Sequence, residues 1–178
     1  MEMQTHPAPH PDEPALYGAF DRLGLPYRTE EHEAVFTVEE GRAVKARLPG
    51  GHSKNLFLKD KAGQFVLISA LGDTPIKLNR LHPHLGTKRL SFGREEALFE
   101  HLGVRPGSVT VFSIINDREH KVHLVLDKAL WQHEHVWFHP LRNTASTRMT
   151  PDDILTFARD TGHEPDVMDL GALAQGGA

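Results

Sequence analysis

The sequence predicts one mixed α/β domain, in which helices surround a mainly antiparallel sheet of six or seven strands or a partly closed barrel. The chain has 178 residues, 39% of them hydrophobic, which is enough for one buried core and short for two. Glycine and proline recur at short intervals, so the elements are short. Strand-like and helix-like segments do not alternate strictly, which argues against a doubly wound parallel sheet. No GxGxxG or Walker loop occurs, which removes the common nucleotide-binding folds.

Helices are predicted from start and stop signals. Residues 14–23 carry an apolar stripe, with Asp12 as a candidate cap and Gly24 as the stop. Thr37 and Glu40 have the spacing of a capping box, which predicts a second helix to residue 47. Three further helices are predicted, at residues 75 onward, 94–102 and 150 onward.

Strands are predicted from short apolar runs between turn residues. Residues 55–60 and 64–70 flank the turn Lys61-Ala62-Gly63, which is a hairpin signature. The other predicted strands are residues 26–32, 89–92, 108–115, 121–126 and 136–139.

The two ends of the chain are predicted to be flexible. Residues 1–13 are polar and proline-rich, and residues 171–178 are rich in glycine, so the single domain is expected to span residues 14–170. The N-terminus lacks the pattern of a signal peptide, and no apolar run approaches a membrane span. We therefore expect a cytoplasmic protein without a membrane partner.

The amino-acid composition excludes several kinds of catalytic site and of binding partner. The chain has no cysteine, which excludes disulfides, thiolate catalysis and cysteine-ligated zinc. A net charge of −4 argues against a protein that coats long tracts of nucleic acid. Residues 74–94, however, contain no acidic side chain and several basic ones. Such a run is usually a solvated face, but its length favours a surface for an anionic partner.

Four motifs in chain order carry a resemblance to a known family. They are GHSKNLFL at residues 51–58, PGSVTVF at 106–112, VLDKAL at 125–130 and FHPLRNTAS at 138–146. With these motifs the chain resembles the YbaK/ProX family of stand-alone aminoacyl-tRNA editing domains, over residues 16–170. The form of the first and last motifs is most similar to the branch acting on alanyl-tRNA(Pro). One departure is Val111, where the family's loop commonly has proline.

The resemblance implies a deacylase that hydrolyses mischarged tRNA(Pro), with Ala-tRNA(Pro) as the first expectation and Cys-tRNA(Pro) or another mischarged tRNA as the alternative. The expected partner is the acceptor end of tRNA(Pro) carrying a wrong amino acid, and prolyl-tRNA synthetase is a further candidate. An aminoacyl ester is already activated, so placing a water and stabilising the oxyanion can suffice. The resemblance implies that a hydroxyl of the terminal adenosine helps to place this water. No cofactor or metal is expected.

Three residues are candidates for the catalytic centre. Lys54 follows a Gly-Gly turn and opens an apolar strand, so its ammonium can hold the phosphate or ribose of the terminal adenosine. Asn55 should point to the other face of that strand and support a loop. His139 precedes Pro140 and is expected to hydrogen-bond near the ester or the amino group. Without the resemblance, Lys54 would be interpreted as an ordinary edge lysine with its ammonium in water. His139 would be equally consistent with a structural histidine and with a functional one.

Further residues are expected to bind substrate or tRNA. Glycine allows close backbone approach in the loop before residue 111, although a Pro-Gly turn is also common anywhere. The candidates for substrate binding are Gly107, Ser108, Val109, Thr110, Asp127 and Asn143. The candidates for tRNA binding are Lys77, Arg80, Lys88 and Arg89.

Two other functions compete with editing. The chain has 13 histidines, and His133-Glu134-His135 on a strand would place both imidazoles on one face, as would His82 and His84. No third ligand motif accompanies either pair, so a metal hydrolase is the weaker alternative. The acid-free run at residues 74–94 alternatively fits a non-catalytic module that binds nucleic acid or a synthetase.

Overall fold

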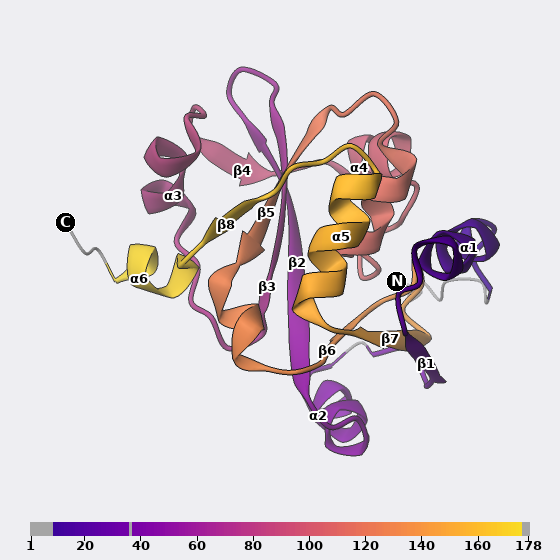
Figure 1. Ribbon diagram of the computed structural model, residues 1–178. Helices are drawn as coiled ribbons and strands as arrows, with labels where there is room; N and C mark the ends of the chain where they lie inside the picture. The colour runs from indigo at the N-terminus through magenta and orange to yellow at the C-terminus, as the bar shows by residue number, and fades with distance from the viewer. Residues whose placement is uncertain (1–8, 36, 176–178) are drawn as a thin grey trace.

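The computed structural model describes residues 9–35 and 37–175 of the chain. Its centre is an eight-stranded mixed sheet in the order β1-β7-β6-β2-β3-β5-β8, with β4 also paired to β2 (Figure 1). The strands are β1 Arg28–Glu31, β2 Gly51–Asp60, β3 Phe65–Leu71, β4 Leu90–Phe92, β5 Val122–Asp127, β6 Val136–Phe138, β7 Ala145–Met149 and β8 Asp166–Met168. The helices are α1 Glu13–Leu23, α2 Val38–Arg47, α3 Leu78–Leu85, α4 Glu95–Leu102, α5 Pro151–Asp160 and α6 Leu170–Ala174, with 3₁₀ helices η1 Val111–Asn116 and η2 Lys128–Gln132.

The predicted fold class is confirmed, and the sheet is more mixed than the sequence indicated. Strand β2 pairs antiparallel with β3 and β4, and β7 pairs antiparallel with β1 and β6. The pairs β2–β6, β3–β5 and β5–β8 are parallel. In the described part of the chain the sheet is open, with β1 and β8 at its ends, so the partly closed barrel is not formed.

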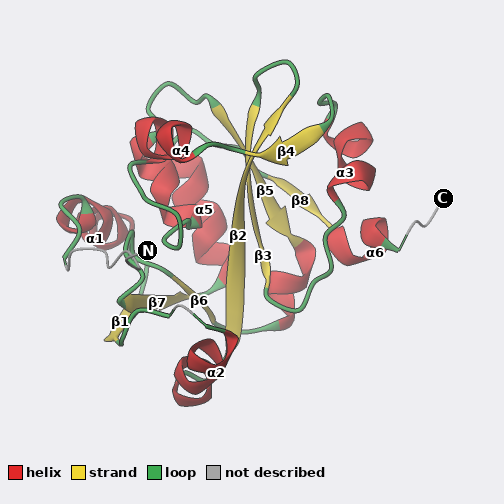
Figure 2. Ribbon diagram, turned by 180° about the vertical axis from the view of Figure 1, so that it is seen from behind, coloured by secondary structure: helices red, strands yellow, loops and turns green. Residues whose placement is uncertain are grey.

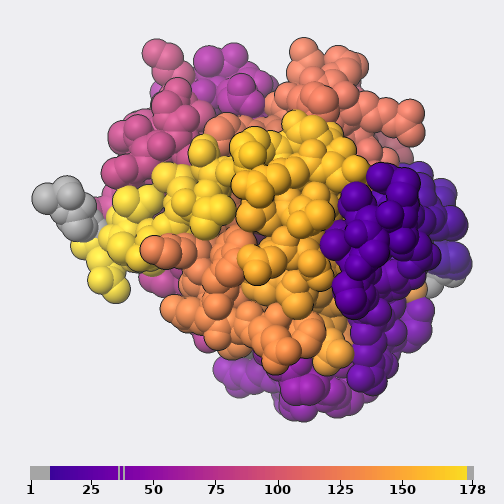
Figure 3. All heavy atoms as spheres, viewed as in Figure 1, coloured from indigo at the N-terminus to yellow at the C-terminus, as the bar shows by residue number. Residues whose placement is uncertain are grey.

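Two apolar layers cover opposite faces of the sheet. Along β2, Phe57 belongs to the first layer and Leu58 to the second, because successive side chains point to opposite faces. Helices α1, α4 and α5 pack on the first layer, and α3 and α6 pack on the second (Figure 2). Helices α1 and α5 lie side by side on the face shown in Figure 3, where Arg22 pairs with Asp160.

Local signals placed most helix ends correctly. The Thr37 side chain accepts the Glu40 backbone N–H at 3.1 Å and starts α2, which confirms the predicted capping box. Thr150 caps α5, which has proline in its first turn. Asp12 occupies the N-cap position of α1, but its side chain makes no capping hydrogen bond there. The helix predicted from residue 75 begins at Leu78.

The strand predicted at residues 108–115 is wrong, because this segment forms η1. Val111, Phe112 and Ile114 are all at most 1% exposed, and such a continuously buried run has no period that separates a strand from a tight helix. Thr110 starts the 3₁₀ turn by accepting the Phe112 N–H at 3.3 Å. Strands β7 and β8 were missed, since one is polar in sequence and the other has three residues.

The folded part extends beyond the predicted domain ends. Glu13 was assigned to the N-terminal tail, but it is 2% exposed and contacts Arg142. Helix α6 takes in residues 171–174 of the predicted C-terminal tail, and it buries Ala174. Residues 1–8 and 176–178 of the two predicted tails lie outside the described residues. None of the described helices is long and apolar enough to cross a membrane.

Candidate functional site

Lys54 lies on β2, opposite Ala70 of β3, and faces the second apolar layer. Gly50, with φ of 118°, allows the chain to turn into this strand. The half-buried Lys54 ammonium donates a hydrogen bond to the carbonyl oxygen of Thr74, in the loop between β3 and α3. Lys54 is therefore held at a fixed position, unlike an edge lysine whose head extends into water.

Asp127 holds the loop that receives Lys54. It is fully buried at the end of β5, and its Oδ2 accepts the Thr74 hydroxyl at 2.6 Å and the Leu71 N–H at 3.1 Å. Its Oδ1 accepts the Ala129 N–H at 3.0 Å. The contacts of Asp127 place it behind Thr74, where it orients Lys54 through the loop. Sequence reasoning missed Thr74, whose only signal was its place in a Gly-Asp-Thr-Pro turn.

Asn55 points to the other face of β2, as its neighbouring position predicted. Its Nδ2 donates to Ser53 Oγ at 3.2 Å, and Ser53 donates to the Trp137 carbonyl at 2.8 Å. In the described part of the chain, Asn55 Oδ1 and Oγ of its cross-strand partner Ser69 are buried without a hydrogen-bond partner. Buried polar atoms are rarely left unpaired, so this spot is suited to bind a polar group of a ligand.

His139 lies at the wall of a small cavity of about 120 Å³ between α2, β2 and β6. Its Nδ1 hydrogen-bonds the Ala145 carbonyl at 2.9 Å. His52 lines the same cavity and lies two residues before Lys54 on the same face of β2, about 7 Å along the strand. The cavity therefore lies at the start of β2, where His52 and Ser53 line it and Lys54 follows in the strand.

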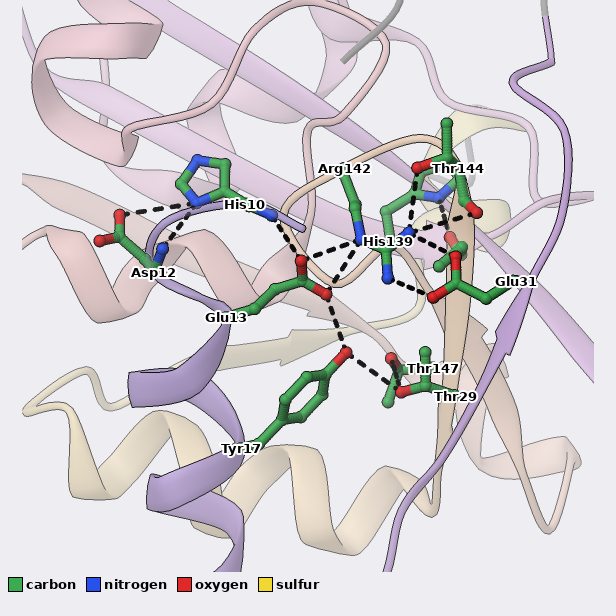
Figure 4. A network of polar contacts seen from close by, with 11 residues as sticks. His10, Asp12, Glu13, Tyr17, Thr29, Glu31, His139, Arg142, Thr144 and Thr147 are labelled. Atoms are coloured by element: carbon green, nitrogen blue, oxygen red, sulfur yellow. Dashed lines mark hydrogen bonds and ion pairs between the residues drawn. The ribbon is translucent and has the colours of Figure 1, made fainter. Parts of the chain in front are cut away.

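A buried ion-pair network fixes the loop that follows His139 (Figure 4). Arg142 lies between Glu13, with Nε–Oε2 at 2.9 Å, and Glu31, with Nη1–Oε2 at 2.6 Å. The hydrogen bonds that Arg142 donates to Glu31 are the largest cause of the raised pKa of Arg142, which stays charged. The buried Leu141 has a φ of 71°, a strained conformation for leucine that its surroundings must enforce. Asn143 follows in this loop, 4% exposed, and its Oδ1 has no hydrogen-bond partner in the described part of the chain.

The loop from Gly107 to Thr110 packs on the first apolar layer, through Val109. Gly107 has a φ of 91°, which glycine adopts readily. Ser108 and Thr110 are buried, and Val111 begins η1 at the position where the family commonly has proline. This layer is the one that Asn55 faces, opposite Lys54. The approach of the Gly107 loop to the cleft of Lys54 and His139 stays a prediction.

The four residues expected to bind tRNA form an exposed basic surface. Lys77 occupies the N-cap of α3, Arg80 lies within it, and Lys88 and Arg89 precede β4. None of the four makes an ion pair within residues 9–35 and 37–175. Helix α3 packs on the layer that Lys54 faces, and it begins shortly after Thr74. The basic surface therefore lies on the side of the sheet that Lys54 faces.

The histidine pairs do not have the geometry of the metal alternative. His133 and His135 precede β6, which starts at Val136, so they do not share the face of a strand. His82 and His84 lie on α3, where residues two apart point in different directions. The described residues contain no group of three or more histidine and acidic side chains that could hold a metal ion.

The family and the similar proteins found by comparison are consistent with one another. The family described as "Aminoacyl-tRNA editing domain" matches residues 32–157. The mouse (Mus musculus) prolyl-tRNA synthetase associated domain-containing protein 1 is 43% identical over 157 residues, covering 84% of this chain and 92% of that protein. The prolyl-tRNA editing protein ProX of Acetoanaerobium sticklandii is 32% identical over 150 residues, with the same two coverages. A solved structure described as a candidate trans-editing enzyme for prolyl tRNA synthetase shares the fold, with a TM-score of 0.69 and 22% identity over 90% of this chain and 97% of that one.

Proposed function

This chain belongs to the aminoacyl-tRNA editing domain family of the YbaK/ProX type, and we propose that it is a deacylase that hydrolyses mischarged tRNA(Pro), Ala-tRNA(Pro) above all. The observation that carries the proposal is the position of Lys54. Its ammonium is fixed by Thr74, beside a small cavity and next to an exposed basic surface. Such an arrangement suits an anionic polynucleotide whose 3′ end carries a small acyl group.

The proposed reaction depends more on positioning of the ester for attack by water than on a strong nucleophile of the protein. Lys54 binds the phosphate or ribose of the terminal adenosine, and this holds the ester carbonyl at the cleft. Water attacks the carbonyl carbon, the ester C–O bond breaks, and the tRNA hydroxyl leaves with a proton. Hydrogen-bond donors of the protein near the ester stabilise the oxyanion that forms when water attacks the carbonyl carbon.

The cavity has room for the small side chain of alanine, the amino acid that we propose is removed. At about 120 Å³ it is small, and Trp137 and Phe138 form part of its wall. A synthetase built for proline cannot strongly reject a smaller side chain by binding alone, so a second and smaller site is the usual solution. We propose that the cavity near Lys54 is this second site and that it holds the small side chain of alanine.

A deacylation panel tests the proposal. The protein at catalytic concentration is mixed with tRNA(Pro) carrying alanine, cysteine, serine or proline, and release of the amino acid is followed. We expect alanine to be released fastest, proline to be spared, and activity to survive exhaustive EDTA treatment. Tight binding of every tRNA without turnover would instead favour the non-catalytic module, for which the names of relatives such as the mouse protein suggest prolyl-tRNA synthetase as a partner.

A further inference from the structure

The cavity beside Lys54 is lined by three imidazoles, each held through one ring nitrogen by a backbone carbonyl. His32 Nδ1 lies 2.8 Å from the Glu33 oxygen, His52 Nε2 lies 2.8 Å from the Leu48 oxygen, and His139 Nδ1 lies 2.9 Å from the Ala145 oxygen. A carbonyl oxygen only accepts, so these nitrogens carry the proton. In the neutral rings of His32 and His52 the second nitrogen is then an acceptor.

The acceptor nitrogen of His32 is paired with a serine of the same cavity. His32 Nε2 lies 2.8 Å from Oγ of Ser146, which is 7% exposed and lines the cavity. Because the His32 tautomer is fixed by Glu33, the Ser146 hydroxyl donates to Nε2. The lone pairs of Ser146 Oγ then remain as acceptors. Ser146 ends the FHPLRNTAS motif, but no motif pointed to its pairing with His32.

The described wall of the cavity is rich in hydrogen-bond acceptors. Among the described residues, its wall contains no carboxylate, and its one cationic side chain is Lys45, which is exposed on α2. Burial is the largest cause of a lowered pKa for His52, so this ring stays neutral at physiological pH. A ligand that fits such a wall is small and donates hydrogen bonds. Within an aminoacyl ester, the group with these properties is the α-amino group.

We propose that the His32–Ser146 pair, together with His52, binds the α-amino group of the aminoacyl ester and selects substrates whose amine is free. The proposal rests on the proposed function, since it assigns a part of the same substrate. His52 and Lys54 lie on the same face of β2, about 7 Å apart along the strand, so the proposed amine site and the lysine are on the same side of the sheet. His32 and Ser146 thereby become specificity-determining residues.

A pair of non-hydrolysable analogues tests the assignment without relying on turnover. The probes are 3′-amide-linked alanyl-adenosine and its lactyl counterpart, in which a hydroxyl replaces the amine at nearly the same size. We expect the wild-type protein to bind the alanyl analogue about ten- to hundredfold more tightly, as measured by NMR titration. Ser146→Ala and His32→Phe should lower affinity for the alanyl analogue by about tenfold or more and change affinity for the lactyl analogue little. His123→Gln, a matched histidine that pairs with Asp166 near β8, should leave both affinities unchanged.

The outcomes separate the two proposals. Equal affinity of the wild-type protein for both analogues overturns the amine assignment, even if one variant fails to fold. Equal losses for both analogues in folded Ser146→Ala also overturn it and leave a purely structural role. A wild-type protein that shows the amine preference but deacylates no tRNA supports the assignment, while the proposed hydrolysis fails.

Discussion

At the scale of single residues, Lys54 differs from its neighbour on the same strand. Lys59 is also on β2, but it is exposed, whereas the Lys54 ammonium is held by a carbonyl whose loop is fixed by the fully buried Asp127. Fixing a flexible side chain before the substrate arrives lowers the entropy lost on binding. This is the physical reason to assign the reacting end of the tRNA to Lys54.

Replacing Lys54 should therefore reduce turnover itself. For Lys54→Ala we expect kcat at saturating tRNA to fall by about a hundredfold or more, since the ester is no longer positioned. Lys59→Ala is the matched control and should retain wild-type turnover. Single-turnover deacylation measures both, with circular dichroism as a check on folding. Wild-type turnover in Lys54→Ala would favour the non-catalytic module.

Loss of Arg142 should lower the stability of the fold strongly. Arg142→Met leaves Glu13 buried without its partner, and breaking a buried pair in this way typically costs about 3–5 kcal/mol. Arg22→Met, which breaks the more exposed pair with Asp160, should cost less than about 1 kcal/mol. Urea unfolding at neutral pH compares the two variants. Similar losses in both would mean that the network around the His139 loop is not a stabilising feature.

At the scale of elements, helix α3 carries exposed basic side chains that we expect to bind tRNA and to take no part in catalysis. Arg80→Ala should mainly raise KM, and the slope of log affinity against log salt should weaken by about one phosphate contact. Arg159→Ala is the control, because this exposed arginine lies on α5, which packs on the opposite face of the sheet. Filter binding over a salt series gives both slopes. A fall in kcat with unchanged KM for Arg80→Ala would contradict a role in gripping the tRNA backbone.

At the scale of the whole molecule, surface ion pairs make stability depend on pH. A hydrogen bond from Arg142 lowers the pKa of Glu31, and one from Arg22 lowers the pKa of Asp160. A carboxyl whose pKa is lower in the folded state binds fewer protons there, so its contribution is present above the unfolded pKa and is lost as the pH falls through the folded value. Stability should therefore decrease below about pH 4.5.

Comparison of the wild-type protein with Glu31→Gln by urea unfolding at a series of pH values checks this expectation. The wild-type protein should be the more stable of the two at pH 7, and the difference should close as the pH falls. A difference that stays constant down to about pH 2 would show that the pKa of Glu31 is not lowered by folding.

The sequence by itself determined the family, the fold class and most helix boundaries. Motifs such as GHSKNLFL are contiguous, and caps such as Thr37 act within three residues, so both can be read without knowledge of the fold. Local patterns gave the wrong element where a run of residues is buried continuously, as in η1. Burial on all sides removes the alternation of apolar and polar residues that distinguishes a strand from a helix.

Only the tertiary structure decided which residues surround Lys54. Thr74 meets Asp127 across 53 residues, Ser146 meets His32 across 114, and Arg142 meets Glu13 across 129. No local pattern encodes such contacts, because strand order in the sheet and the packing of helices on its two faces bring these segments together. The sequence could therefore name the lysine and the histidine, while the hydrogen bonds that position them and the cavity that His139 lines follow from the fold.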